Sequence, residues 1–281
     1  MSVVPVAASR RAALLLGLTT VVGVVAFCWP LLAAPSGSGA VDLAHLSDAP
    51  WVFLLLVPLL LGVVVSELAD GGMDSRSVAL LGVLAACASA LRLAGAGVTG
   101  FEAVFFLLIP AGRVLGRRFG FVLGAVTLVA SALLTGGVGP WLPFQMLAAA
   151  WIGYGAGCLP RARGRAEVAL LAGYGIVAGL AYGLVLDLWF WPFSLDDGSA
   201  VAYVAGAPVA TNLGRFWVFH VTTSMGWDLP RAATNALLMV LAGPAVLAAL
   251  RRASRRASFG VPVSFGPDPV APAAPGVGQG T

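Results

Sequence analysis

Three polar side chains interrupt long apolar stretches and are the first candidates for chemistry. Glu102 begins one such stretch, Gln145 lies near the start of another, and Asn235 lies near the start of a third. Burying a polar group without a partner costs on the order of a few kcal/mol. We therefore expect the three to share a pocket, and a pocket with a few convergent polar groups is a typical small-molecule site.

Acidic and aromatic residues occupy similar places, near the ends of apolar stretches. Trp141 comes shortly before Gln145, and Asp187 and Trp189 end the apolar stretch that starts near Ala166. Tryptophans at such places commonly anchor helices at the membrane–water interface. They are also suitable walls for a pocket, so both interpretations stay open for each tryptophan.

Motifs for catalysis and metal binding are missing from the sequence. The chain contains no lysine, which excludes a P-loop, and it has neither H-E-x-x-H nor G-x-S-x-G. Its two histidines, His45 and His220, stand apart, and its three cysteines lie in apolar runs without C-x-x-C spacing. We expect no enzyme activity, no metal and no cofactor, and any energy for transport must come from outside this chain.

The amino-acid composition indicates that the candidate residues belong to a membrane protein. Of 281 residues, 59% are hydrophobic and 10% charged, with a mean hydropathy of +0.95. A soluble domain is about a quarter charged, so a soluble enzyme is excluded and most of the outer surface must face lipid. The net charge of +4 is interpreted as membrane topology and not as nucleic-acid binding.

Eight apolar stretches are candidates for crossing the membrane. About 20 apolar residues in a helix span the hydrocarbon core, and the sequence therefore predicts an all-α, polytopic membrane helical bundle. The predicted spans are Ala12–Ala34, Trp51–Ser66, Ser77–Gly95, Val98–Leu115, Phe119–Thr135, Leu142–Leu159, Ala166–Trp189 and Ala232–Leu250.

Arginine placement predicts the orientation. With eight crossings and a cytoplasmic N-terminus, thirteen of the sixteen arginines lie inside and only Arg92, Arg215 and Arg231 lie outside, as the positive-inside rule requires. The fourth stretch must cross for this pattern to hold. The inside set is Arg10, Arg11, Arg76, Arg113, Arg117, Arg118, Arg161, Arg163, Arg165, Arg251, Arg252, Arg255 and Arg256.

Three further segments need an interpretation. Ser9-Arg10-Arg11 before an apolar run faintly resembles a twin-arginine export signal, but the run is long for one, which favours a retained first helix. The connection from Phe190 to Arg231 is predicted to be a long outer loop, and residues 257–281, rich in Pro, Gly and Ala, are predicted to be a disordered cytoplasmic tail.

The third stretch carries small residues at four-residue spacing: Gly82, Ala86 and Ala90. Such a stripe lets another helix approach closely. Packing within the chain is its ordinary use, and a partner protein is the alternative.

Several of these segments together resemble the substrate-specific (S) subunit of an energy-coupling factor (ECF) transporter. The resemblance covers six helices from about Ser77 to Leu250. It rests on Gly100-Phe101-Glu102, the turn from Ala111 to Gly120 (AGRVLGRRFG), and the run from Gly136 to Gln145 (GGVGPWLPFQ) with the later Gly153 to Gly157 (GYGAG). The organisation it implies is a two-helix membrane extension over 1–76, a six-helix S-subunit-like core over 77–256 and the tail.

The resemblance implies a receptor that binds a vitamin or related micronutrient from outside and topples to release it inward. Its partners would be a membrane T subunit, which would contact Gly82, Ala86 and Ala90, and two ATPase subunits. The pocket positions it implies are Glu102, Trp141, Gln145, Asp187, Trp189 and Asn235. The extra N-terminal helices and the long connection depart from the family pattern.

The sequence thus predicts a multi-pass protein of the bacterial cell membrane, with both termini cytoplasmic. The charges beside the expected pocket favour a neutral or cationic heterocyclic cargo, and a cobalamin-related compound is the first candidate. Two alternatives stay open: an ion-coupled secondary transporter that uses Glu102 or Asp187, and a membrane assembly protein that does not transport.

Overall fold

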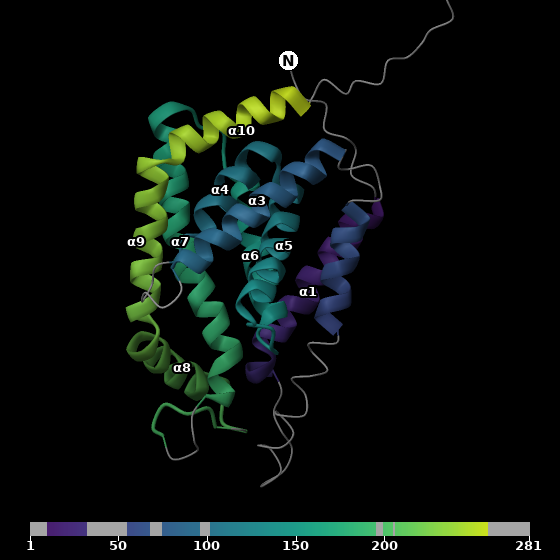
Figure 1. Cartoon of the computed structure of the whole chain (residues 1–281). Helices are drawn as coiled ribbons and strands as arrows, with labels where there is room; N and C mark the ends of the chain where they lie inside the picture. Colours follow the sequence, from purple (N-terminus) through teal and green to yellow (C-terminus); the bar gives the residue numbers. More distant parts are fainter. Residues whose placement is uncertain are drawn as a thin grey trace, which may run out of the picture.

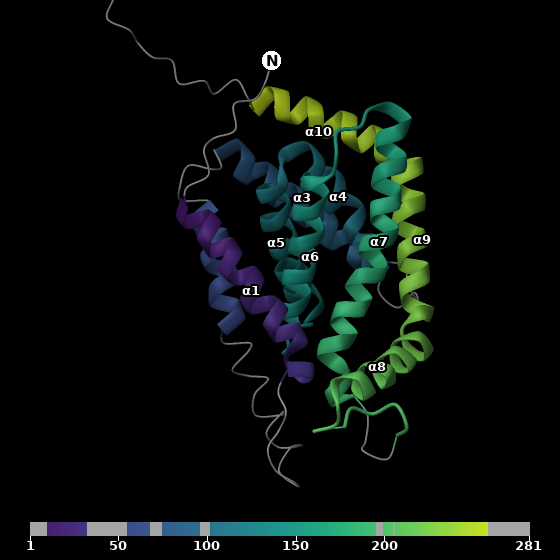
Figure 2. The same cartoon turned by 180° about the vertical axis from the view of Figure 1, so that it is seen from behind.

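The computed structural model describes residues 10–32, 55–67, 75–95, 102–194, 199–204 and 206–257 (Figures 1 and 2). Residues 1–9, the predicted tail beyond 257 and Val98–Phe101 lie outside this part. Its helices are α1 (Arg10–Leu32), an unlabelled helix Leu55–Glu67, α3 (Ser75–Ala94), α4 (Val104–Leu115), α5 (Arg117–Thr135), α6 (Leu142–Cys158), α7 (Gly164–Phe190), the 3₁₀ turn η1 (Trp191–Phe193), α8 (Val209–Thr223), α9 (Met225–Leu241) and α10 (Gly243–Ala257).

The described chain is helical without any β-strand, which confirms the predicted helical bundle. Three helices, α3, α5 and α7, are long and apolar enough to cross a membrane, and the bent pair α9–α10 would make a fourth. Large apolar side chains lie on the outside, such as Leu14, Leu133 and Leu241, each at least 70% exposed. Soluble monomers rarely expose so much apolar surface, so the protein is a membrane protein.

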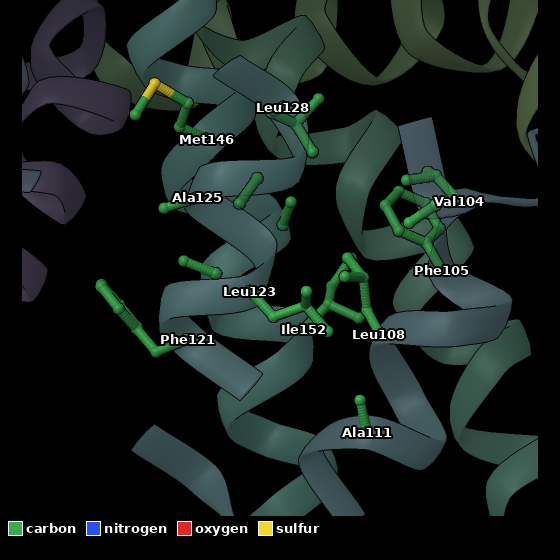
Figure 3. Packing of buried hydrophobic residues seen from close by; sticks show 14 of the residues in the cluster. Val104, Phe105, Leu108, Ala111, Phe121, Leu123, Ala125, Leu128, Met146 and Ile152 are labelled. Carbon is green, nitrogen blue, oxygen red and sulfur yellow. The ribbon is translucent and has the colours of Figure 1, made fainter. Parts of the chain in front are cut away.

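The core lies between α4, α5 and α6, and glycine makes it tight. A Cβ at Gly120 would collide with the backbone of Gly153, and one at Gly124 would collide with the backbone of Ala149. The two helix backbones can therefore approach closely, which is how membrane helices gain packing energy without a hydrophobic drive. Figure 3 shows the side chains packed around this contact, among them Phe105, Leu108, Phe121, Leu123 and Ile152.

The N-terminal helices pack on this core. The ring centroid of Phe27 in α1 lies 5.0 Å from that of Phe144 and 5.6 Å from that of Trp151, both in α6. At the end of the helix Leu55–Glu67, Glu67 pairs with Arg118 of α5, with 3.4 Å between Oε1 and Nη1. Figure 2 shows α1 lying beside α6 and α7.

Two predicted spans differ from the observed helices. The part of the fourth that the structure describes is helical from Val104 to Leu115, and 12 residues make roughly 18 Å of helix, less than the hydrocarbon core of roughly 30 Å. The eighth is broken: α9 and α10 meet at a 65° bend. The break falls at Gly243-Pro244, where proline lacks the N–H and the space that a continuing helix needs.

The predicted long loop contains a helix. Within Phe190–Arg231, α8 forms and α9 already begins at Met225. Trp191 is fully buried, donates a hydrogen bond from Nε1 to the Val201 carbonyl at 2.7 Å, and packs against Phe216 of α8 and Tyr203. Burial raises the pKa of the Tyr203 phenol, so it stays neutral there. Figure 1 shows α8 at one end of α7 and α9, and α10 at their other end.

Candidate functional site

A glycine face on α7 allows α9 to approach. Gly175, Gly179 and Gly183 are buried at four-residue spacing. A Cβ at Gly179 would lie 3.1 Å from the Cα of Ala232, and one at Gly183 would overlap the carboxylate of Asp228. The missing side chains make room for a charged group between two helices.

Arg231 joins the charges of this interface. Its Nε donates a hydrogen bond to Glu102, which precedes α4, and its Nη1 donates to Asp228, one turn earlier on α9. The Asp228 side chain is 2% exposed and that of Arg231 is 11% exposed. The guanidinium also lies 5.3 Å from the ring centroid of Tyr182, a cation–π contact. One guanidinium thus neutralises two carboxylates, as its planar fork of donors allows.

His220 of α8 extends the network. Its Nδ1 lies 2.6 Å from Oδ2 of Asp187 in α7, and its Nε2 lies 3.9 Å from Oδ2 of Asp228. The His220 side chain is 3% exposed and stacks on Phe216 with 5.9 Å between centroids. The residue therefore connects α7, α8 and α9.

Asn235 completes the network on α9. Its Nδ2 donates to the backbone carbonyls of Glu102 and Arg231, both at 2.8 Å. Its Oδ1 is buried and has no hydrogen-bond donor, and the same holds for Oδ2 of Asp228. The network therefore offers more buried acceptors than donors, and we call the set of Glu102, Asp187, His220, Asp228, Arg231 and Asn235 the polar network.

Gln145 is held by an arginine of α3. Arg92 donates from Nη2 to Oε1 of Gln145 at 3.2 Å and from Nη1 to the Ser131 hydroxyl at 3.1 Å. This contact connects α3, α5 and α6 and includes no member of the polar network.

The two predicted pocket tryptophans are held by other contacts. Trp141 is 44% exposed and donates from Nε1 to the carbonyl of Gly137 at 3.1 Å. Trp189 packs on Phe144 with 4.6 Å between centroids. Of the six predicted pocket residues, Asn235 bonds directly to the backbone of Glu102, and Asp187 is linked to them through His220, Asp228 and Arg231. Gln145 is held separately by Arg92.

Four residues of this region were not predicted as site residues: Tyr182, His220, Asp228 and Arg231. The sequence analysis placed the last three in a loop. Asp228 and Arg231 are oppositely charged and three residues apart, which is the spacing of a helical ion pair. The glycines at 175, 179 and 183 were the corresponding signal on α7, because small residues at this spacing mark close helix packing.

The opposite end of the bundle carries the reverse arrangement. Glu167 at the start of α7 is 2% exposed. Its carboxylate accepts hydrogen bonds from Nε of Arg113 at 3.0 Å and from Nη2 of Arg251 at 2.6 Å. This ion cluster holds α10 over the end of α4. Further arginines are exposed on α10, at the start of α5, in the α6–α7 turn and in the first turn of α7: Arg117, Arg161, Arg163, Arg165, Arg252 and Arg255.

The predicted partner stripe lies on the outside of α3. Gly82, Ala86 and Ala90 are exposed, whereas Ala85 and Ser89 are buried against the core. Nothing in the described chain lies within 4 Å of a Cβ built at Gly82. Helix packing within this part of the chain therefore does not use the stripe.

The site defines the class of protein only coarsely. It belongs to a helical membrane protein with a buried network of three acids, one asparagine, one histidine and one arginine. Within the described residues, no cluster of three or more His, Cys, Asp or Glu side chains is arranged for a metal ion. Comparison with models of known families, with curated proteins and with solved structures gave no match.

The network predicts a large stability effect at Arg231. Arg231→Gln leaves Asp228 buried without its counter-ion, which costs about 3–5 kcal/mol. Thermal unfolding of the purified protein in detergent measures it. Arg252→Gln, at an exposed position, is the matched control. In the double variant Asp228→Asn/Arg231→Gln the loss should be smaller than the sum of the two single losses, because the two side chains interact. Equal stability of Arg231→Gln and Arg252→Gln would contradict this role.

Proposed function

We propose that this chain is the substrate-binding subunit of an importer of the energy-coupling factor type and is not an enzyme. It captures a vitamin or related micronutrient at the outer face and delivers it together with a membrane T subunit and two ATPases. The resemblance of the segments around Glu102, the turn from Ala111 to Gly120 and the run ending at Gln145 is the starting point for this proposal.

The exposed stripe on α3 is the observation that carries the proposal. Small residues in a membrane helix are ordinarily used for packing within the chain. Here Ala85 and Ser89 serve that purpose, while Gly82, Ala86 and Ala90 face outward. The outward face of α3 is therefore available for close packing against a helix of another membrane protein.

The two ends of the bundle support an orientation. The exposed arginines around α10 fall at one end, and the polar network lies toward the other, where α8 joins α7 and α9. By the positive-inside rule, the α10 end faces the cytoplasm of a bacterial cell and both termini lie there. The polar network then belongs to the half that receives solute from outside.

The cargo follows from the balance of donors and acceptors. Three carboxylates face one arginine and one histidine, and Oδ2 of Asp228 and Oδ1 of Asn235 lack donors. A neutral or cationic heterocycle that donates hydrogen bonds fits this site better than a multiply phosphorylated compound. A cobalamin-related compound is the first candidate of this class.

An ion-coupled secondary transporter is the second candidate function. Membrane-embedded acids linked to a histidine are typical of proton pathways, and the structure joins Asp187 to Asp228 through His220.

Binding tests the receptor proposal directly. Purified protein, titrated with a panel of vitamins and their precursors by calorimetry, should bind one member with a dissociation constant below about 10 μM, that is about −7 kcal/mol. Gln145→Leu should weaken that binding about tenfold or more, because the site loses a hydrogen bond. No binding by any member of the panel would count against the proposal.

Association tests the role of the stripe. Ala86→Leu and Ala90→Leu should abolish co-purification with a T subunit and ATPases, because a larger side chain prevents close helix contact. The matched control is Val177→Leu, which enlarges an exposed apolar residue of α7. Unchanged co-purification in the stripe variants would show that the partner, if present, binds elsewhere, and Gln145→Leu should not affect it.

Transport separates the two candidate functions. In vesicles that contain this chain alone, the receptor proposal expects no uptake under a proton or sodium gradient. The secondary transporter instead predicts gradient-driven uptake without ATP, lost in Glu102→Gln or Asp187→Asn. Flux of a radiolabelled cargo measures both cases.

A further inference from the structure

His220 is enclosed by two carboxylates from two other helices. Its Nδ1 lies 2.6 Å from Oδ2 of Asp187, and its Nε2 faces Oδ2 of Asp228 at 3.9 Å. The side chains of His220 and Asp228 are 3% and 2% exposed, and that of Asp187 is 17% exposed. Bulk solvent is therefore largely removed from the three groups, and charges in such a place interact strongly.

The hydrogen-bond donors and acceptors of Asp187, His220 and Asp228 can be counted for each protonation state of the imidazole. A neutral imidazole has one N–H and one lone pair. If the N–H is on Nδ1, the Nε2 lone pair faces the buried carboxylate of Asp228, whose Oδ2 has no donor. If the N–H is on Nε2, the Nδ1 lone pair faces Asp187 at hydrogen-bond distance. One additional proton removes both conflicts, because an imidazolium donates from Nδ1 to Asp187 at 2.6 Å and places its positive charge 3.9 Å from the carboxylate of Asp228.

We propose that Asp187, His220 and Asp228 form a proton-binding site, and that the bound proton holds α8 against α7 and α9. This inference goes beyond the proposed function and needs neither a cargo nor a partner protein. It makes α8 a helix whose attachment depends on pH.

The surroundings of His220 add no competing positive charge at hydrogen-bond distance. From α7 it faces Asp187, and from α9 it faces Asp228, whose other oxygen is held by Arg231. Arg231 in turn pairs with Glu102 before α4. On α8 itself the neighbours are aromatic, Phe216 and Trp217, and Arg215 donates to the carbonyl of Ala202 at 3.2 Å. A protonated His220 would therefore place one positive charge of α8 between Asp187 of α7 and Asp228 of α9.

Loss of the proton would weaken the attachment without unfolding the bundle. The triad would change from one net negative charge to two, and one of the contacts of His220 would turn from attraction to repulsion. α8 would keep its aromatic packing, in which Phe216 and Phe219 lie around Trp191. The expected change is therefore a looser α8 over an intact core.

The sequence makes the proton directly observable, because the chain has only two histidines, His45 and His220. Protein labelled with ¹³C and ¹⁵N in histidine gives two imidazole signals in nanodiscs, and His45→Gln assigns them. The expected His220 signal is an imidazolium with both ring nitrogens protonated, which converts to neutral imidazole in one step as the pH is raised from 5 to 9. A neutral His220 over the whole range would overturn the proposal.

Hydrogen–deuterium exchange tests the effect on α8 in the same samples. The protection of α8 amides relative to α5 amides, measured at each pH, should fall about tenfold across the His220 transition, because a charge-assisted contact is lost. In His220→Gln, α8 should be less protected and its relative protection should not depend on pH. A His220 transition without any change in α8 protection would equally overturn the proposal.

A glycine pair provides the matched control. Gly183→Ala displaces the Asp228 carboxylate and should abolish the pH step in α8 protection. Gly175→Ala places its Cβ at ordinary contact distances of 3.5 Å and more and should keep the step. These measurements use protein without cargo, so a failure to bind any vitamin would refute the receptor proposal and leave the result on the proton site unaffected.

Discussion

The pairing of Arg231 with Glu102 and Asp228 is the contact on which the rest of the polar network depends. Two carboxylates lie in a bundle that has very little polar surface, and an unpaired buried charge would be expensive. Arginine solves this because its planar fork reaches both acids at once. The pairing is possible only because Gly179 and Gly183 let α9 lie close to α7. The contact connects the residue before α4 to the first turns of α9.

The other end of the bundle uses the opposite charges for the same purpose. There a single acid, Glu167, lies between Arg113 and Arg251, whereas Arg231 lies between two acids. Since Glu102 precedes α4 and Arg113 is in its last turn, this short helix is held by an ion cluster at each end. α4 therefore connects the two ion clusters, and its middle packs in the apolar core.

Sequence reasoning found the residues that are exceptions to their surroundings and missed those that it assigned to a loop. Glu102, Asp187 and Asn235 are polar groups within apolar stretches, so the need for partners could be inferred, and each has a partner within the polar network. His220, Asp228 and Arg231 lie in a segment whose polarity is typical of a loop, although it folds as α8 and α9. The break at Gly243-Pro244 was missed because hydropathy averages over it. Ion pairs between helices depend on how the helices turn toward each other, which no local pattern specifies.

The way the network is filled restricts what else can enter the site. Most of its strong donors are already committed: Nε and Nη1 of Arg231 to two acids, and Nδ2 of Asn235 to two carbonyls. Outside the network, Arg92 is committed to Gln145 and Ser131. The acceptors are not, since Oδ2 of Asp228 and Oδ1 of Asn235 have no donor. A phosphorylated solute would need arginines that are engaged and would meet carboxylates of its own charge. Under the two proposals above, the charge of a protonated His220 would face Oδ2 of Asp228, and Oδ1 of Asn235 would remain as an acceptor for a donor group of a neutral or cationic solute.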